Sequence, residues 1–252
     1  MAKTDVLYSG LKVLCRSRYS LTVIIIVVVV LEPFGSTLTY GFPPYRSTDA
    51  ETADPWTLEG RLGLFRIERE RRENAYASPL LRFNLGLPGN REFVSEFEYR
   101  PDEGKVADAA VGFKWIPLMR SLSVGMETLV LLPVSSPQNK GAGVESLLLA
   151  TLRVHALRVH VNAGGFYDAR PEASEGGWKS SGLVEVRLGR LRPGVEVFAK
   201  QVRAQPVQVL AGLGVIFDVG PFDLRAGLHM GLTGAAADLT PSLWVTSKFP
   251  LR

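Results

Sequence analysis

After residue 56, the chain alternates apolar and polar residues one by one along most of its length. The stretch from Leu157 to Ala163, for example, reads Leu-Arg-Val-His-Val-Asn-Ala. Successive side chains of a strand point to opposite faces, so this stretch has one apolar face and one polar face. No window keeps an apolar stripe at helical spacing for three turns. The pattern therefore predicts an all-β domain built from half-buried strands.

The same alternation recurs about twelve times, and the stretches are separated by segments rich in Pro, Gly, Asn and Asp. Two of these polar segments, 133–143 and 168–180, are long enough to predict extended loops. The predicted strands are 57–68, 78–87, 91–99, 106–115, 121–132, 144–155, 157–167, 182–188, 194–202, 206–217, 222–232 and 239–249.

The length and number of the strands favour a membrane barrel. Transmembrane strands need about 9 to 11 residues and occur in even numbers, whereas strands of soluble sandwiches average about five or six residues. Aromatic residues near the predicted strand ends would form interfacial girdles; these are Trp56, Tyr76, Tyr99, Trp115, Tyr167, Phe217, Phe222 and Phe249. We predict an antiparallel transmembrane β-barrel of about twelve strands, with the two long loops on its exterior side. A soluble periplasmic β-barrel is the alternative.

The polar face of the strands carries both signs of charge. An Arg or Lys facing lipid at the bilayer midplane costs about 2–4 kcal/mol, so these side chains should point into the barrel. Opposite charges on neighbouring strands can pair. They either brace and fill a small barrel or set a selective polar pathway. The residues predicted to line the lumen are Glu59, Arg61, Arg82, Glu96, Glu98, Lys114, Glu127, Arg153, Arg158, His160, Glu185, Arg187, Lys200, Arg225 and His229.

Residues 1–38 have the features of a secretory signal peptide. Four basic residues precede an apolar run, 23–31, which Glu32 and Pro33 end. The run is shorter than the roughly 18 residues that a spanning helix needs. An uncleaved anchor and a buried strand are the alternatives. Residues 39–55 are rich in Pro and Asp without any period and predict an extended leader or plug-like loop, and residues 56–252 form the predicted outer-membrane barrel.

Composition excludes some function classes. The formal net charge is +4, but basic residues alternate with acidic ones and form no patch or aromatic platform, so nucleic-acid binding is not expected. Cys15 is the single cysteine and precedes the apolar run. A mature chain without it would form no disulfide.

No catalytic residue, metal site or cofactor is predicted, and we do not expect an enzyme. His155 and His160 fall on adjacent predicted strands, but a metal site needs a third ligand close by, and His229 is four strands away. An outer-membrane lipase would need a Ser–His pair, and no histidine stands in a Gly-x-Ser or His-x-Ser context. The glycines at 164–165 and 212–214 lie within predicted strands and indicate bends or packing sites.

The segment before the first strand carries a resemblance to a known family. Residues 44–52 read Pro-Tyr-Arg-Ser-Thr-Asp-Ala-Glu-Thr, and residues 56–59 read Trp-Thr-Leu-Glu. The first is similar to the short Thr-Asp-Asp-Ala leader of the bacterial outer-membrane family of MetA-pathway phenol-degradation proteins, which are transporter-like β-barrels. The second resembles the first-strand opening of that family. This chain has one Asp where the family tends to have two, and it ends on Phe-Pro-Leu-Arg.

What the resemblance implies is an outer-membrane channel for hydrophobic or aromatic compounds. Together with the alternation, it leads us to expect a porin-type protein in the outer membrane of a Gram-negative-type bacterium. Its expected partners are the lipid bilayer and small, including hydrophobic or aromatic, solutes that pass passively. A closed structural outer-membrane barrel and a soluble periplasmic ligand-binding barrel are the alternatives. No oligomeric state is predicted.

Overall fold

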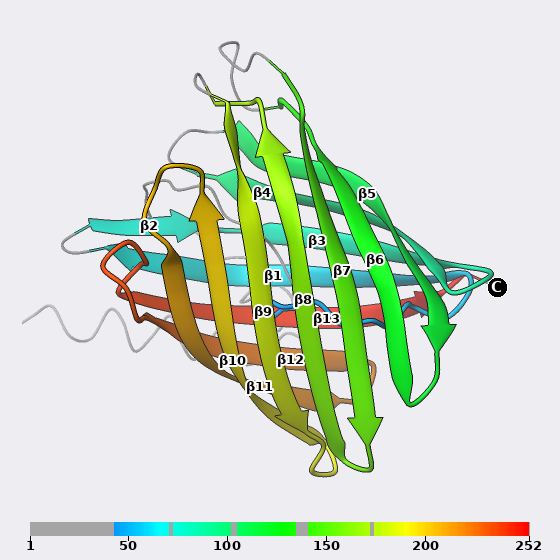
Figure 1. Ribbon diagram of the computed structural model, residues 1–252. Helices are drawn as coiled ribbons and strands as arrows, with labels where there is room; N and C mark the ends of the chain where they lie inside the picture. The colour runs from blue at the N-terminus through cyan, green and yellow to red at the C-terminus, as the bar shows by residue number, and fades with distance from the viewer. Residues whose placement is uncertain (1–42, 71–72, 102–104, 135–140, 172–173, 252) are drawn as a thin grey trace, which may run out of the picture. The chain divides into compact units, whose positions relative to one another are not determined.

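The strands belong to a single antiparallel sheet. The computed structural model describes residues 43–70, 73–101, 105–134, 141–171 and 174–251 (Figure 1). Its strands are β1 (Thr57–Glu70), β2 (Glu73–Ala77), β3 (Leu80–Leu87), β4 (Arg91–Arg100), β5 (Lys105–Met119), β6 (Leu122–Leu131), β7 (Gly143–Val154), β8 (Leu157–Asp168), β9 (Glu175–Val186), β10 (Leu191–Val202), β11 (Gln208–Val219), β12 (Phe222–Gly231) and β13 (Leu239–Pro250).

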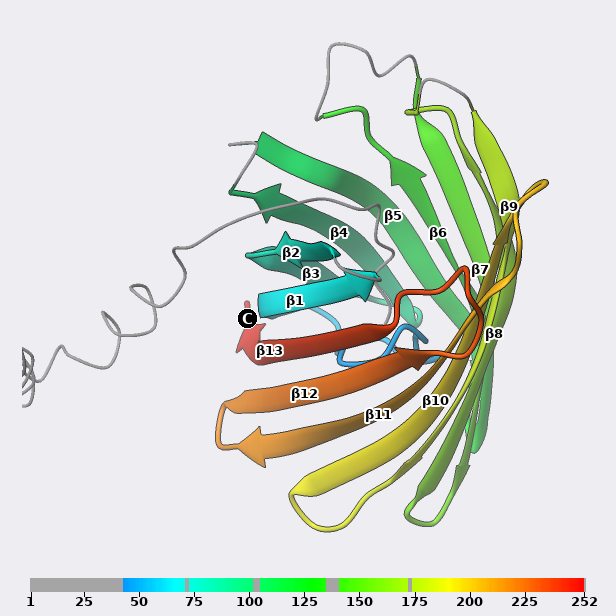
Figure 2. The same ribbon diagram turned by 90° about the vertical axis from the view of Figure 1, so that its left-hand side faces the viewer.

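The sheet closes on itself. From β3 onward each strand pairs with the next, and β13 pairs with β1 from Thr57↔Pro250 to Arg69↔Leu239. Strands β3 and β2 lie one after the other along the same edge of β1, opposite residues 58–63 and 66–70. The ring is therefore twelve strands around (Figure 2), which confirms the predicted all-β, twelve-stranded antiparallel barrel.

Two predicted boundaries are wrong. Most of the predicted loop 168–180 is strand, because β9 begins at Glu175 and pairs with Asp168 and the residues before it. The two glycines at 176–177 hide the alternation in the sequence, yet their backbones continue the ladder. The predicted strand 78–87 starts two residues too early and misses the strand before it: β2 and β3 are separated at Ser78-Pro79, because Pro79 has no N–H to donate. The Ser78 hydroxyl instead donates to the Leu64 carbonyl at 2.7 Å.

Apolar side chains cover the outer face of the barrel. Leu148 in mid-strand β7 is 68% exposed and Leu213 in β11 is 61% exposed, although both are large and apolar. Alternate positions of the strands face inward, and many of them carry buried polar side chains: in β3, for example, Arg82 is 1% exposed. This is the reverse of a soluble barrel, whose charged side chains meet water outside. It matches a barrel whose outer surface contacts lipid and whose polar residues face inward.

The two ends of the barrel differ in their connections. One end, the short-turn end, carries the connections 88–90, 120–121, 155–156, 187–190 and 220–221, together with the start of β1 and the end of β13. The connections at the other, long-loop end include 169–174, 203–207 and 232–238. Exposed aromatic residues ring both ends. Trp56, Trp115, Phe217, Phe222 and Phe249 lie at the short-turn end, and Tyr99, Tyr167 and Trp178 lie at the long-loop end.

The predicted signal peptide, residues 1–38, lies outside the described residues, and so do residues 39–42. Within the described part of the chain, no helix is long and apolar enough to cross a membrane.

Candidate functional site

The interior of the barrel holds the segment that precedes β1. Residues 43–55, here called the leader, form neither strand nor helix and run along the inner wall (Figure 2, in blue). The leader joins β1 through Trp56, whose N–H donates to the Gly86 carbonyl of β3 at 2.8 Å. Traced backwards from Trp56, it follows the wall round to β12. Its hydrogen-bond partners on the wall include, in that order, Glu92, Lys114, Thr151, Asn162, Glu196 and Arg225.

Glycines on the inner wall make room for the leader. A Cβ added at Gly86 would lie 2.1 Å from a carbonyl oxygen of the leader. A Cβ at Gly194 would lie 2.5 Å from the Tyr45 hydroxyl oxygen, and one at Gly214 would lie 2.5 Å from Cε1 of the same ring. Any larger side chain at these positions would occupy the space that the leader fills.

Two side chains of the leader pack against apolar residues of the wall. Tyr45 and Ala50 are both fully buried. The wall residues that pack against them are Leu183 and Ile216 for Tyr45, and Ile116 and Leu149 for Ala50. Burial of apolar surface adds a favourable free energy that does not depend on charge, so the leader is held by packing as well as by ion pairs.

Glu196 of β10 accepts three hydrogen bonds from the leader. Its side chain is fully buried. Oε2 accepts a hydrogen bond from the Arg46 N–H at 2.9 Å, and Oε1 accepts from both the N–H and the hydroxyl of Ser47. His229 Nε2 lies 2.7 Å from Oε2 on the wall side. A buried carboxylate needs several donors to offset its lost hydration, and most of the donors here come from the leader.

Asp49 pairs with a buried lysine of the wall. Lys114 Nζ of β5 donates to Asp49 Oδ1 at 2.8 Å and lies 3.5 Å from Thr48 Oγ1. Burial alone would raise the pKa of Asp49, but the cationic charges of Lys114 and Arg61 hold it well below its usual value. Asp49 is therefore a carboxylate anion in the docked leader.

Glu51 of the leader is shared by two arginines of neighbouring strands. Arg153 Nε at the end of β7 donates to Glu51 Oε1 at 2.9 Å, and Arg158 Nη1 at the start of β8 donates to the same oxygen at 3.2 Å. All three side chains are about one-quarter exposed. Solvent therefore screens this cluster more than the buried contact between Asp49 and Lys114.

Ion pairs also connect charged residues on the rest of the inner face. Arg82 and Glu96 lie on the adjacent strands β3 and β4, two of the pairs join residues two apart on one strand, and the others join strands that are not adjacent in the sheet. The pairs are Arg82 with Glu96 (2.9 Å) and Glu127 (2.7 Å), Arg66 with Glu98 (3.3 Å), Arg61 with Glu59 (2.7 Å), Arg225 with Asp223 (3.0 Å), and Lys179 with Glu145.

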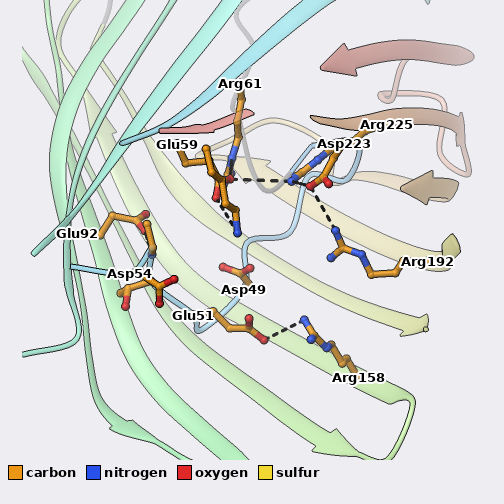
Figure 3. Close-up of a pocket in the computed structure, with 13 residues that line it drawn as sticks. Asp49, Glu51, Asp54, Glu59, Arg61, Glu92, Arg158, Arg192, Asp223 and Arg225 are labelled. Carbon is orange, nitrogen blue, oxygen red and sulfur yellow. Dashed lines mark hydrogen bonds and ion pairs between the residues drawn. The ribbon is translucent and has the colours of Figure 1, made fainter. Parts of the chain in front are cut away.

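A cavity of about 230 Å³ lies between the leader and the short-turn end of the barrel (Figure 3). Glu51 of the leader points toward Arg158 across one side of it, and Glu59, Arg61, Arg225, Asp223 and Arg192 gather on the other side. Ala53 is the only apolar residue that lines it. The cavity thus presents charges of both signs to anything that enters.

Most residues predicted to line the lumen are buried on the inner face. These are Glu59, Arg61, Arg82, Glu96, Glu98, Lys114, Glu127, His160, Glu185, Arg225 and His229. Three more, Arg153, Arg158 and Lys200, are half-buried. Arg153 and Arg158 donate hydrogen bonds to Glu51. The Nζ atom of Lys200 lies 5.0 Å from the centre of the Phe166 ring. Arg187 lies apart from them. It follows the end of β9, in the turn 187–190, and its side chain is 55% exposed beside Asp218.

The sequence interpretation omitted several residues of this site. Glu92 and Asn162 sit at polar positions of predicted strands, so alternation could have identified both of them. Lys179 was missed because its strand was interpreted as a loop. Asp49 and Glu51 carry no periodic signal, since the leader is not a strand, and only their position in the lumen reveals their partners.

Comparisons with known proteins identify the fold. No family model matches the chain, and no curated protein matches it. Among solved structures, the NanC porin is 11% identical over 76% of this chain and 100% of that one, with a TM-score of 0.57. A porin refined at 1.8 Å resolution is 14% identical (68% of this chain, 62% of that chain, TM-score 0.42), and the anion-selective porin from Comamonas acidovorans is 10% identical (69% and 60%, TM-score 0.42). The chain thus spans less than two thirds of the last two. The fold is that of outer-membrane β-barrels.

Proposed function

We propose that the protein is a channel of the bacterial outer membrane through which small polar solutes pass when the leader leaves its place in the lumen. The apolar outer face and the aromatic residues at both ends favour a lipid bilayer as its surroundings. In such barrels the short turns face the periplasm and the longer loops face outward, so the leader and its cavity would be closest to the periplasmic side.

The observation that carries this proposal is how the lumen is filled. A barrel that serves only as a scaffold can fill its interior with the side chains of its own strands. Here a separate segment occupies the interior, and it is held by side-chain hydrogen bonds, ion pairs and two apolar contacts. It makes no strand pairing with the wall. Such a segment can move without breaking the sheet.

The lining of the cavity favours polar solutes. The family resemblance suggests hydrophobic or aromatic compounds, but a purely apolar solute would remove water from many charged groups in this cavity without replacing their hydrogen bonds. An aromatic solute would fit better if it carried a charged or hydrogen-bonding group. The polar lining therefore argues for ionic or hydroxylated solutes.

Planar-bilayer recordings test the proposal. The purified full-length protein should give discrete conductance steps, with more frequent openings when the leader is loosened by Glu196→Gln. Absence of steps in both proteins, with a heat-modifiable barrel on gels, would favour the closed structural barrel. Recovery of the protein in the soluble periplasmic fraction would favour the ligand-binding alternative.

A further inference from the structure

The cations on the inner wall of the barrel fall into two groups by the position of the carboxylate that pairs with them. Cations of the first group pair with a carboxylate on the wall itself. Arg82 has two such partners, Glu96 and Glu127, and Lys179 is bonded to Glu145. These pairs persist whether or not the leader is present, so the wall balances these charges by itself.

Lys114 and Arg153 form the second group. Lys114 is 1% exposed, and among the described residues its only salt-bridge partner is Asp49 of the leader. For Arg153 the only such partner in the described part of the chain is Glu51, also of the leader. Arg158 divides its interaction between Glu51 at 3.2 Å and Glu185 at 3.7 Å. The leader supplies the carboxylates that Lys114 and Arg153 contact directly, although Glu92 and Glu127 lie opposite Lys114 on the two neighbouring strands.

Departure of the leader would leave these cations without their nearest counter-charge. An uncompensated charge is costly where it is buried, as Lys114 is, and an incoming anion can remove that cost. A carboxylate also matches the fork of donors that an arginine presents. Lys114 and Arg153 would therefore favour a carboxylate from solution after the leader has left.

The leader also indicates the shape of such a ligand. Its two carboxylates are separated along the chain by Ala50, which packs against Ile116 of β5 and Leu149 of β7. The cations lie on β5, β7 and β8 on either side of this apolar contact. Two carboxylates joined by a short aliphatic chain reproduce this order of charged, apolar and charged groups.

We propose that Lys114, Arg153 and Arg158 form a carboxylate-binding subsite in the lumen, which Asp49 and Glu51 occupy as built-in ligands and for which short aliphatic dicarboxylates compete. The subsite deepens the proposed function, because it names the class of solute that would release the leader. Binding of the solute and departure of the leader are then one exchange of anions at the same cations.

Thiol labelling measures this exchange without any need for conductance. In a Cys15→Ser background, Thr48→Cys places a thiol on a fully buried leader position, and a water-soluble methanethiosulfonate reaches it only when the leader leaves. The probe is glutarate, and its uncharged diamide is the control. We expect excess glutarate to raise the labelling rate about tenfold and the diamide to leave it unchanged. An equal rate with and without glutarate would overturn the proposal.

Substitutions on both sides of the exchange sharpen the test. Lys114→Met with Arg153→Gln should abolish the response to glutarate, whereas Arg187→Gln, which removes an exposed basic residue at the same end, should keep it. If the wall variant does not fold, Asp49→Asn with Glu51→Gln leaves the wall intact and should lower the glutarate concentration needed for half-maximal labelling. A response that persists without Lys114 and Arg153, or an unchanged half-maximal concentration, contradicts the subsite.

The labelling result and the conductance result separate the two proposals. Release of the leader by glutarate in a barrel that shows no conductance steps would support the subsite and reject the channel. Conductance steps with no response to glutarate would support the channel and reject the subsite.

Discussion

The substitution Glu196→Gln tests whether the leader is held as its contacts indicate. Glu196 accepts hydrogen bonds from two backbone N–H groups and one hydroxyl of the leader, and it also contacts His229. Glutamine keeps the shape of the side chain but removes its charge and replaces one acceptor oxygen with an NH₂ donor. In either orientation that donor would face a leader N–H, since Oε1 accepts from Ser47 and Oε2 from Arg46, so at least one favourable contact becomes unfavourable.

The size of the effect follows from the burial of the site. A hydrogen bond to a charged group contributes about 1.5–3 kcal/mol, and a buried donor left without a partner costs a further 1–3 kcal/mol or so. Because Glu196 is fully buried, solvent screening does not reduce these values. We therefore expect docking of the leader to weaken by about 3 kcal/mol. Since 1.4 kcal/mol corresponds to a factor of ten, the undocked fraction should rise about 100-fold.

The assay is the labelling rate of the Thr48→Cys leader in the Cys15→Ser background. Glu185→Gln is a matched control, since Glu185 is equally buried on the neighbouring strand β9 and contacts Arg158 and His160 of the wall instead of the leader. We expect the rate to rise about 100-fold with Glu196→Gln and far less with Glu185→Gln. Heat-modifiable migration on gels shows that each barrel is folded. Equal labelling of the wild type and the Glu196→Gln variant, both folded, would refute this account of how the leader is held.

Three further predictions concern the fit, the charge and the outer face of the barrel. The valine side chain of Gly214→Val would overlap Tyr45 of the leader, so this variant should increase channel openings in planar bilayers. The control Gly182→Ala adds a methyl group where no atom lies within 4 Å and should not increase openings. Equal behaviour of the two variants would contradict the steric argument. Docking lowers the pKa of Asp49 below the 3.8 of a free aspartate, so its contribution to docking is complete above that value and is lost as pH falls. Openings should therefore stay constant from pH 7 to pH 5 or so and increase below about pH 4; an increase between pH 7 and 5 would require another group. Leu148→Arg on the outer face should reduce the stability of the vesicle-inserted barrel to urea by about 2–4 kcal/mol, and no loss would argue against a lipid-facing position.

Local alternation determined most of the barrel. Side chains at successive positions must point to opposite faces of a strand, so a two-residue period identifies the strand, its outer face and its inner face together. Twelve predicted segments correspond to the twelve positions around the ring, although the segment 78–87 covers only β3 and misses β2, which shares its position. The pattern failed where the signal was weak: the two glycines at the start of β9 have no side chains that could alternate.

Pairing partners were only partly accessible from the sequence. Adjacent strands in an up-and-down barrel are neighbours in the chain, so cross-strand pairs such as Arg82 with Glu96 follow from short connections. Arg187 shows the limit of the approach. It continues the alternation of β9 in the sequence, but the strand ends at Val186, and its side chain points to solvent in the turn.

The sequence by itself determined that this chain forms a barrel with an apolar outside and a charged inside, because strand geometry links each residue to a face through its immediate neighbours. Only the tertiary structure decided what fills that inside. The leader has no period, and its contacts with the wall reach residues as far as 182 positions away, as between Pro43 and Arg225. Its position depends on glycines, apolar contacts and cations that come together only once the ring has closed. No local sequence pattern predicts contacts between residues so far apart in the chain. The candidate carboxylate site consists of such contacts.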